Sequence, residues 1–242
     1  MSDHWDTYFC FIEDKFASIV LDMDIWREID QNEYRLPMGV RIPVKNQGES
    51  GTPVGEEAEI LFEDRLTAKI GETGFNVGRL TTNGFREIYY YFNSPYELEK
   101  TAFDIFKGNH YDVQVFQINE NSPWEFYFDF LYPDKYKIQH MGNRKVVESL
   151  MNSGDLLEVP RRVDHWIYFP SDFLRSRFEE KMISFGFEPV LARSDAGEEY
   201  LSQIFRNDYV DYNAINDVTD LLVNVSEEYE GRYDGWETMV IK

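Results

Sequence analysis

Val163-Asp164-His165-Trp166-Ile167-Tyr168-Phe169 is the stretch of sequence that decides the fold of this chain. It predicts a β-strand, and Pro170-Ser171-Asp172 directly after it open a helix. The apolar residues of that helix recur three or four positions apart: Leu174, Phe178, Met182 and Phe185. Gly186 fits the end of the helix, because glycine readily adopts the left-handed backbone that commonly follows a helix.

Downstream of this helix, Phe187–Ala192 and Tyr200–Val210 predict a pair of strands. An amphipathic helix follows, with its N-cap at Asp211 or Asn213. Its apolar stripe is formed by Ile215, Val218, Leu222, Val225 and Tyr229.

Gly231 is expected to close this helix, and Trp236–Ile241 to form the last strand. Between them, Tyr233-Asp234-Gly235-Trp236 predicts a tight turn, because Gly235 permits a positive φ and Asp234 can bond its own backbone. The order from Val163 onward is therefore β-α-β-β-α-β, the split βαβ or ferredoxin-like arrangement.

The first half of the chain predicts the same order behind an additional hairpin. The predicted elements are a hairpin over residues 5–22 that turns at Glu13-Asp14-Lys15, a strand Tyr34–Val44, a loop 46–55, a helix carrying Val54, Ala58, Leu61, Phe62, Leu66 and Ile70, strands Phe75–Thr82 and Phe85–Phe92, a helix from Ser94-Pro95 to about Phe106, and strands Asp112–Ile118 and Trp124–Phe130. Asn83-Gly84 between two of these strands is the strongest short hairpin signal. The predicted fold class is α+β, with two ferredoxin-like (βαββαβ) units in tandem.

Residues 131–143 lack clear periodicity, and we place the domain boundary in this stretch. The predicted domains are residues 1–135 and 136–242, and a short helix, Arg144–Met151, opens the second. Each domain is acidic, with net charges of −13 and −8 out of a total of −21. Such a chain repels nucleic acid and anionic lipid and attracts basic partners, although acidity that serves solubility alone is the simpler explanation.

The sequence contains few of the patterns that support enzymatic chemistry. One cysteine and four scattered histidines give no zinc pattern, and no glycine-rich loop has the context for a phosphate. His165 is expected to be structural, and acid pairs such as Glu63-Asp64 to lie on solvated helix faces. The aromatic run Tyr89–Phe92 lacks the basic surroundings of a nucleic-acid-binding sheet. We therefore predict no catalytic, cofactor-binding or metal-ligating residue, no enzyme, no nucleic-acid or membrane contact, and, without a signal peptide pattern, a cytoplasmic location.

Two stretches of the second half resemble a known family beyond their secondary structure. One is Val159-Pro160-Arg161-Arg162 with the strand that follows it, and the other is Tyr229-Glu230-Gly231-Arg232-Tyr233-Asp234-Gly235-Trp236-Glu237. Together they resemble the regulator of ribonuclease E activity B family, with its hydrophobic-His-(aromatic)-x-(aromatic)-Phe strand and closing Gly-x-Tyr-Asp-Gly-Trp-Glu. The resemblance covers about residues 142–242. It implies a stoichiometric inhibitor that binds ribonuclease E outside its active site and alters its access to RNA and to degradosome partners.

The first half is similar to a bacterial domain of unknown function that often precedes this module. Trp5, the Gly55–Leu66 helix and Thr81-Thr82-Asn83-Gly84-Phe85-Arg86-Glu87 carry that resemblance. No activity follows from it.

The sequence thus predicts an acidic regulator that binds a protein partner, either ribonuclease E or another basic nuclease. The predicted partner-binding residues are Asp164, Trp166, Glu179, Glu180, Tyr233, Asp234 and Trp236. For the last three, a structural role in the predicted turn is the competing interpretation. Two other functions stay open: an immunity-type protein that neutralises a cognate toxin, and an enzyme, which would need a pocket with convergent polar groups and perturbed pKa values.

Overall fold

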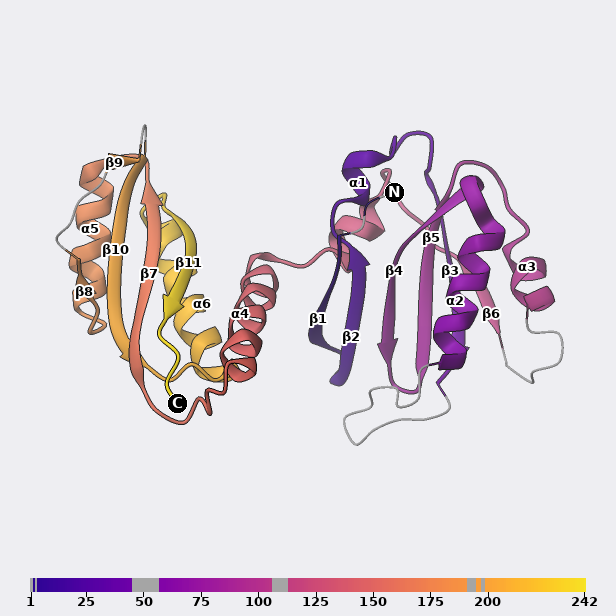
Figure 1. Ribbon diagram of the computed structural model, residues 1–242. Helices are drawn as coiled ribbons and strands as arrows, with labels where there is room; N and C mark the ends of the chain where they lie inside the picture. Colours follow the sequence, from indigo (N-terminus) through magenta and orange to yellow (C-terminus); the bar gives the residue numbers. More distant parts are fainter. Residues whose placement is uncertain (1, 3, 45–56, 106–112, 191–194, 197–198) are drawn as a thin grey trace. The chain divides into compact units, whose positions relative to one another are not determined.

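The computed structural model describes residues 2, 4–44, 57–105, 113–190, 195–196 and 199–242 (Figure 1). The chain forms two compact units, Met1–Asp134 and Lys135–Lys242. Both units combine helices with an antiparallel sheet, so the chain is of the α+β class. The predicted loop 46–55, which includes Val54, lies outside the described residues.

The first unit is built around a six-stranded sheet with the order β1-β2-β4-β5-β3-β6, in which every neighbouring pair is antiparallel. Its elements are β1 (Trp5–Ile12), β2 (Lys15–Asp22), α1 (Ile25–Glu28), β3 (Leu36–Pro43), α2 (Glu57–Ile70), η1 (Gly71–Thr73), β4 (Gly74–Thr82), β5 (Phe85–Phe92), α3 (Leu98–Ile105), β6 (Gln114–Gln117) and η2 (Tyr127–Leu131).

Two tight hairpins hold this sheet in register, and both were predicted. Glu13 and Asp14 between β1 and β2 have φ values of 47° and 61°, and Asn83 and Gly84 between β4 and β5 have φ values of 43° and 83°. A positive φ at both central residues is the feature of the two-residue turn whose twist matches that of the strands it joins.

One face of the first sheet is covered by α2 and α3. The apolar cluster between them and the sheet contains Val40, Ile42, Phe62, Leu66, Ile70, Ile88, Tyr90, Phe92, Leu98 and Ala102. Helix α3 begins at Leu98, four residues later than Ser94. Pro95 therefore precedes the helix instead of occupying its first turn, and Tyr96 stacks on Phe92 with ring centroids 4.9 Å apart.

The opposite face of this sheet is covered by the segment that we predicted as the strand Trp124–Phe130, and that prediction was wrong. Residues 125–126 are α-helical and lead into the π-helical turn η2, and Trp124 before them is a turn residue with a φ of 64°. Trp124 stacks on Tyr91 at 4.5 Å between ring centroids, and the Tyr127 hydroxyl donates to the Asp22 carbonyl at 2.6 Å. Trp124, Tyr127 and Leu131 are buried at intervals of three and four residues, which is helical spacing.

The second unit carries a sheet with the order β11-β7-β10-β8, and β9 pairs with β10. Its elements are α4 (Lys135–Asn152), β7 (Arg161–Phe169), α5 (Asp172–Ile183), β8 (Glu188–Pro189), β9 (Asp195–Ala196), β10 (Glu199–Asp208), α6 (Tyr212–Glu228) and β11 (Arg232–Thr238). The four-strand order and the two crossover helices fit a ferredoxin-like unit. Helices α5 and α6 pack on one face, where Ile167, Phe169, Phe178, Met182, Phe187, Ile204, Val218, Leu222 and Val225 form the core.

Helix α4 shows why the stretch 131–143 lacked periodicity. Residues from Lys135 onward are helical, so the predicted short helix Arg144–Met151 is the second half of a longer one. The buried positions of α4 include Asn143 together with Met141, Val147 and Leu150. A polar side chain therefore stands at a position where the pattern needed an apolar one.

The end of α6 and the start of β11 also differ from the prediction. The left-handed residue after the helix is Glu230, with φ 56°, and the Gly231 N–H donates to the Ser226 carbonyl at 2.8 Å. The predicted tight turn at 233–236 is instead a β-bulge inside β11, because the pairing with β7 shifts register between Tyr233 and Gly235. A bulge admits one additional residue, here Asp234, without ending the strand.

None of the described helices is both long enough and apolar enough to cross a membrane.

Replacing glycine by alanine should have opposite effects on the free energy of unfolding at two positions of the second unit. A Cβ on Gly231 would lie 2.3 Å from the Phe169 ring, whereas a Cβ on Gly142, within α4, meets nothing within 4 Å. We expect Gly231→Ala to lower the free energy of unfolding by about 1–3 kcal/mol through overpacking. Gly142→Ala should raise it by about 0.5–1 kcal/mol, because alanine favours the helix. Urea unfolding of the full chain measures both, and equal effects would contradict the assigned packing of Gly231.

Candidate functional site

The central strand of the second sheet, β7, separates its side chains between two faces. Val163, His165 and Ile167 are buried under the helices, whereas Asp164 and Trp166 alternate with them and are partly exposed. Cross-strand partners share a face, so the register of β7 with β10 and β11 identifies the remaining residues of this second face. We call it the open face, and define it by Arg162, Asp164, Trp166, Tyr168, Leu201, Gln203, Phe205, Arg232 and Glu237.

The helices of the second unit all pack on the side opposite the open face. Helices α5 and α6 contribute to the apolar core, and α4 reaches the same side through Asn143, which accepts a hydrogen bond from the Trp236 indole at 2.8 Å. The ribbon shows the strands β10, β7 and β11 with their other surface free of these helices (Figure 1). Among the described helices of this unit, therefore, none covers the open face.

The centre of the open face is a connected cluster of polar and aromatic groups. The Arg162 guanidinium lies 3.7 Å from the centroid of the Phe205 ring and donates to Asp164 at 2.8 and 2.7 Å. Gln203 donates to the same carboxylate at 3.1 Å. These hydrogen bonds, that from Arg162 foremost, hold the pKa of Asp164 below its usual value. Contacts within the chain thus hold the side chains around Trp166 in place.

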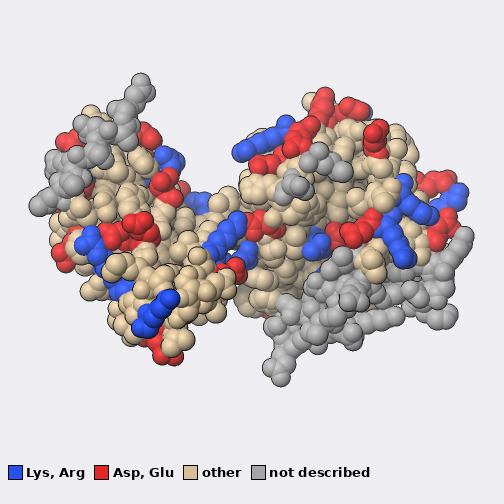
Figure 2. Space-filling model, in the orientation of Figure 1, with Lys and Arg blue, Asp and Glu red and all other residues tan. Residues whose placement is uncertain are grey.

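Exposed carboxylates lie around this centre. Arg232 is positioned over the Tyr168 ring, 4.9 Å from its centroid, and pairs with Asp234 at 2.9 Å and Glu199 at 3.4 Å. The cross-strand positions place Glu188 beside Phe205 and Glu237 beside Asp164. Figure 2 shows acidic side chains distributed over both units. An aromatic centre with an acidic rim can bind a basic, partly apolar surface by shape and charge.

The structure divides the seven predicted partner-binding residues into three groups. Asp164, Trp166 and Asp234 belong to the open face and its rim. Glu179 and Glu180 lie on α5, on the helix side of the sheet, where Glu179 accepts from the Ser202 hydroxyl at 2.9 Å. The other two, Tyr233 and Trp236, point into the unit.

Tyr233 and Trp236 anchor β11 to the interior of the unit. The Tyr233 hydroxyl lies 2.9 Å from His165 Nδ1, and burial raises the pKa of Tyr233. Burial first, and then the charge of Arg206, lower the pKa of His165 from 6.5 to about 3, so this imidazole is neutral at pH 7. The Trp236 partner Asn143 also donates to Thr219 at 2.8 Å. This network joins β11, α4 and α6.

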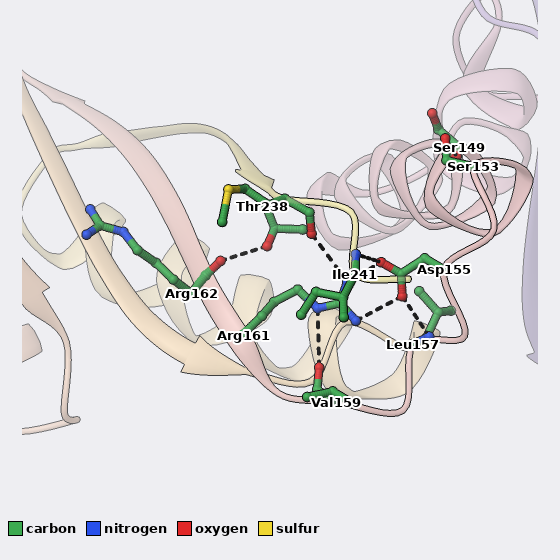
Figure 3. Close-up of polar contacts among 10 residues, drawn as sticks. Ser149, Ser153, Asp155, Leu157, Val159, Arg161, Arg162, Thr238 and Ile241 are labelled. Atoms are coloured by element: carbon green, nitrogen blue, oxygen red, sulfur yellow. Dashed lines mark hydrogen bonds and ion pairs between the residues drawn. The ribbon is translucent and has the colours of Figure 1, made fainter.

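A buried ion pair that sequence reasoning missed fixes the entry to β7 (Figure 3). Asp155 and Arg161 are only 4% and 7% exposed, and their side chains form two hydrogen bonds, one of 2.9 Å. The Asp155 carboxylate also accepts from the backbone N–H groups of Leu157 at 2.9 Å and Ile241 at 2.8 Å. It therefore ties the loop before β7 to the end of the chain. The motif contained Arg161, but nothing in its spacing pointed to Asp155.

The fold is that of an α+β chain, and the open face of its second unit presents aromatic rings within an acidic rim. The chain belongs to a family of unknown function, DUF695, whose family model matches residues 3–132. Residues 140–238 match the model of a second family, Regulator of ribonuclease activity B, which is a regulatory and not a catalytic description. Both resemblances that the sequence predicted are thereby confirmed.

No curated protein matches the chain. A crystal structure of an unknown protein from Galdieria sulphuraria aligns with 85% of this chain and 99% of its own, at 9% sequence identity and a TM-score of 0.25. A TM-score this low does not indicate a shared fold.

The Asp155–Arg161 pair predicts a large and pH-dependent contribution to stability. Asp155→Asn should lower the free energy of unfolding by about 3 kcal/mol at pH 7, because it leaves the Arg161 charge buried without its partner. The hydrogen bond from Arg161 holds the pKa of Asp155 far below its usual value. The contribution is therefore complete above the ordinary carboxyl pKa of about 4 and is lost as the pH falls through the lower, folded-state pKa.

Urea unfolding at pH 7 and at progressively lower pH measures this contribution. The matched control is Asp234→Asn, which makes the same change in an ion pair whose side chains are about half exposed. It should cost less than about 1 kcal/mol. An equal decrease in the free energy of unfolding of the two variants would show that burial of the Asp155–Arg161 pair does not increase its contribution to stability.

Proposed function

We propose that this chain is a regulator that acts by stoichiometric contact with a basic ribonuclease, and that the open face of its second unit makes that contact. The observation that carries the proposal is the fixed Arg162–Asp164–Phe205 cluster beside Trp166, within an acidic rim. It lies inside residues 140–238, which match the model of a family described as a regulator of ribonuclease activity. Ribonuclease E is the candidate partner that the resemblance implies.

The physical case rests on pre-organisation and charge. Aromatic and arginine side chains dominate binding energy at protein interfaces when they are held at the centre of a contact. Here the strands β7 and β10 hold them, so little side-chain entropy remains to be lost on binding. The carboxylates Glu188, Glu199, Asp234 and Glu237 favour a basic partner and should speed association at low salt.

We further propose that residues 1–135 and 136–242 act as two domains, and that the first is a second ferredoxin-like unit extended by a hairpin. Its support is the strand order β6-β3-β5-β4, which is the order of such a unit with β2 and β1 added beside β4. In this proposal the second domain carries the ribonuclease contact.

The test measures the dissociation constant for purified ribonuclease E with the full chain and with paired variants. Trp166→Ala removes an aromatic ring from the open face, and Phe173→Ala removes one from α5 on the other side, where Phe173 is 71% exposed. We expect Trp166→Ala to weaken binding about tenfold or more, as for a central interface residue, and Phe173→Ala to leave it unchanged.

A second pair tests the charge of the rim. Glu237→Lys reverses a rim charge, whereas Glu180→Lys reverses a charge on α5. Only the first should weaken binding and reduce its dependence on salt. Loss of inhibition of RNA cleavage should follow the loss of binding.

Binding of ribonuclease E that is equally sensitive to both members of each pair would place the contact elsewhere. No binding of ribonuclease E, with tight binding of a different basic nuclease encoded beside this chain, would support the immunity-type alternative instead.

A further inference from the structure

The N-terminal hairpin extends the first sheet beyond the helices that cover it, and this leaves a groove. Helix α2 packs over β3 and β5, while β2 and β1 lie on the far side of β4 (Figure 1). The groove has a volume of about 920 Å³. Its walls include Trp5 and Asp22 from the hairpin, Glu63 and Asp64 from α2, and Asn76 and Arg79 from β4.

One wall of the groove is electrically neutral and fixed. The Glu63 carboxylate accepts from Asn76 at 2.8 Å and from Arg79 at 3.1 Å. These contacts hold α2 to β4 along the groove and use both oxygens of Glu63. The Arg79 charge is thereby cancelled and does not offset the other carboxylates.

The remaining carboxylates give the groove a surplus of negative charge. Asp22 is 2% exposed and stands directly across from Trp5 in the β1–β2 ladder. Its carboxylate Oδ1 accepts from the Asp24 N–H at 3.2 Å, and its Oδ2 has no hydrogen-bond partner among the described residues. Exposed Asp64 and Glu72 add charge at the rim. A buried carboxylate with an oxygen available favours a cationic hydrogen-bond donor.

Aromatic rings accompany these carboxylates. Trp5 lines the groove beside Asp22, and Tyr34 and Phe75 line it with their ring centroids 4.7 Å apart. Aromatic faces attract guanidinium and ammonium groups and pack against their apolar stems. The combination selects an organic cation of the kind that arginine and lysine side chains carry.

The apolar surface continues past the groove along the hairpin. Phe9 and Phe11 lie on the same side of β1 as Trp5, because residues two apart in a strand share a face, and both are exposed. Phe9 stacks on Phe16 with ring centroids 5.5 Å apart. A free amine would fill the groove and leave this stripe uncovered, whereas a protein segment would cover both.

We propose that the groove and the adjoining stripe bind a segment of a protein partner in which arginine or lysine stands beside apolar residues. The cation enters the groove between Trp5 and Asp22, and the apolar neighbours pack on Phe9 and Phe11. This proposal concerns the first unit and does not depend on what the open face binds.

The test uses the full chain and a fluorescently labelled, end-blocked peptide of alternating leucine and arginine, with binding followed by anisotropy. The same peptide with citrulline in place of arginine keeps the shape and removes the charge. We expect the citrulline peptide to bind about tenfold more weakly, as for the loss of a charge-assisted hydrogen bond. Asp22→Asn should weaken binding of the arginine peptide by a similar factor, and Glu158→Gln, at an exposed carboxylate of the second unit, should not change it.

Two further variants keep the test valid if Asp22→Asn fails to fold. The double change Asp64→Asn/Glu72→Gln alters only exposed side chains and should weaken binding about threefold. Phe11→Ser also alters an exposed side chain. It should weaken binding of the arginine peptide and leave the affinity for the competitor spermidine unchanged. The proposal would be overturned if the arginine and citrulline peptides bound equally well, or if the folded carboxylate variants bound the arginine peptide as tightly as the unchanged chain. It would also be overturned if spermidine bound as tightly as the peptide and displaced it.

Discussion

Side chains alternate between the two faces of a β-strand. In each unit of this protein, the helices cover only part of the surface that the sheet presents. In the second unit the alternation along β7 sends His165 and Ile167 into the core and leaves Asp164 and Trp166 on a face that the three helices do not reach. In the first unit the hairpin β1–β2 carries the sheet past α2. The open face and the groove thus have the same physical origin.

Where local rules decide the structure, the sequence predicted it well. The β7 strand, the helix after it and the final amphipathic helix all follow from apolar spacing. The second of these helices is capped by Asp211, one of its two predicted N-caps, and the first is capped by Ser171, within the predicted opening Pro170-Ser171-Asp172. Asn83-Gly84 predicted its hairpin because few other residue pairs accept positive φ at both positions. The same local clarity allowed both family resemblances to be recognised.

Where distant side chains decide the structure, sequence reasoning failed. Asn143 breaks the apolar pattern of α4 because it is polar and yet buried. Its hydrogen-bond partners, Trp236 and Thr219, lie far along the chain, so the local sequence did not indicate this role. Trp124 stacks on Tyr91 directly before a helical segment, although aromatic residues favour strands. In the closing motif, Tyr233 and Trp236 were placed in the same predicted site as Asp164. The bulge at Asp234 aims the two aromatics inward and leaves that aspartate outside. No spacing rule distinguishes these outcomes.

The most direct test of the proposed contact follows the indole N–H signals of the five tryptophans by nuclear magnetic resonance while ribonuclease E is added to the labelled full chain. Trp166 lies on the open face, whereas Trp236 is buried and bonded to Asn143 within the same unit. If the open face makes the contact, the Trp166 signal shifts or broadens in proportion to bound partner and the Trp236 signal does not. A saturated complex in which the Trp166 signal is unchanged would show that the contact lies elsewhere.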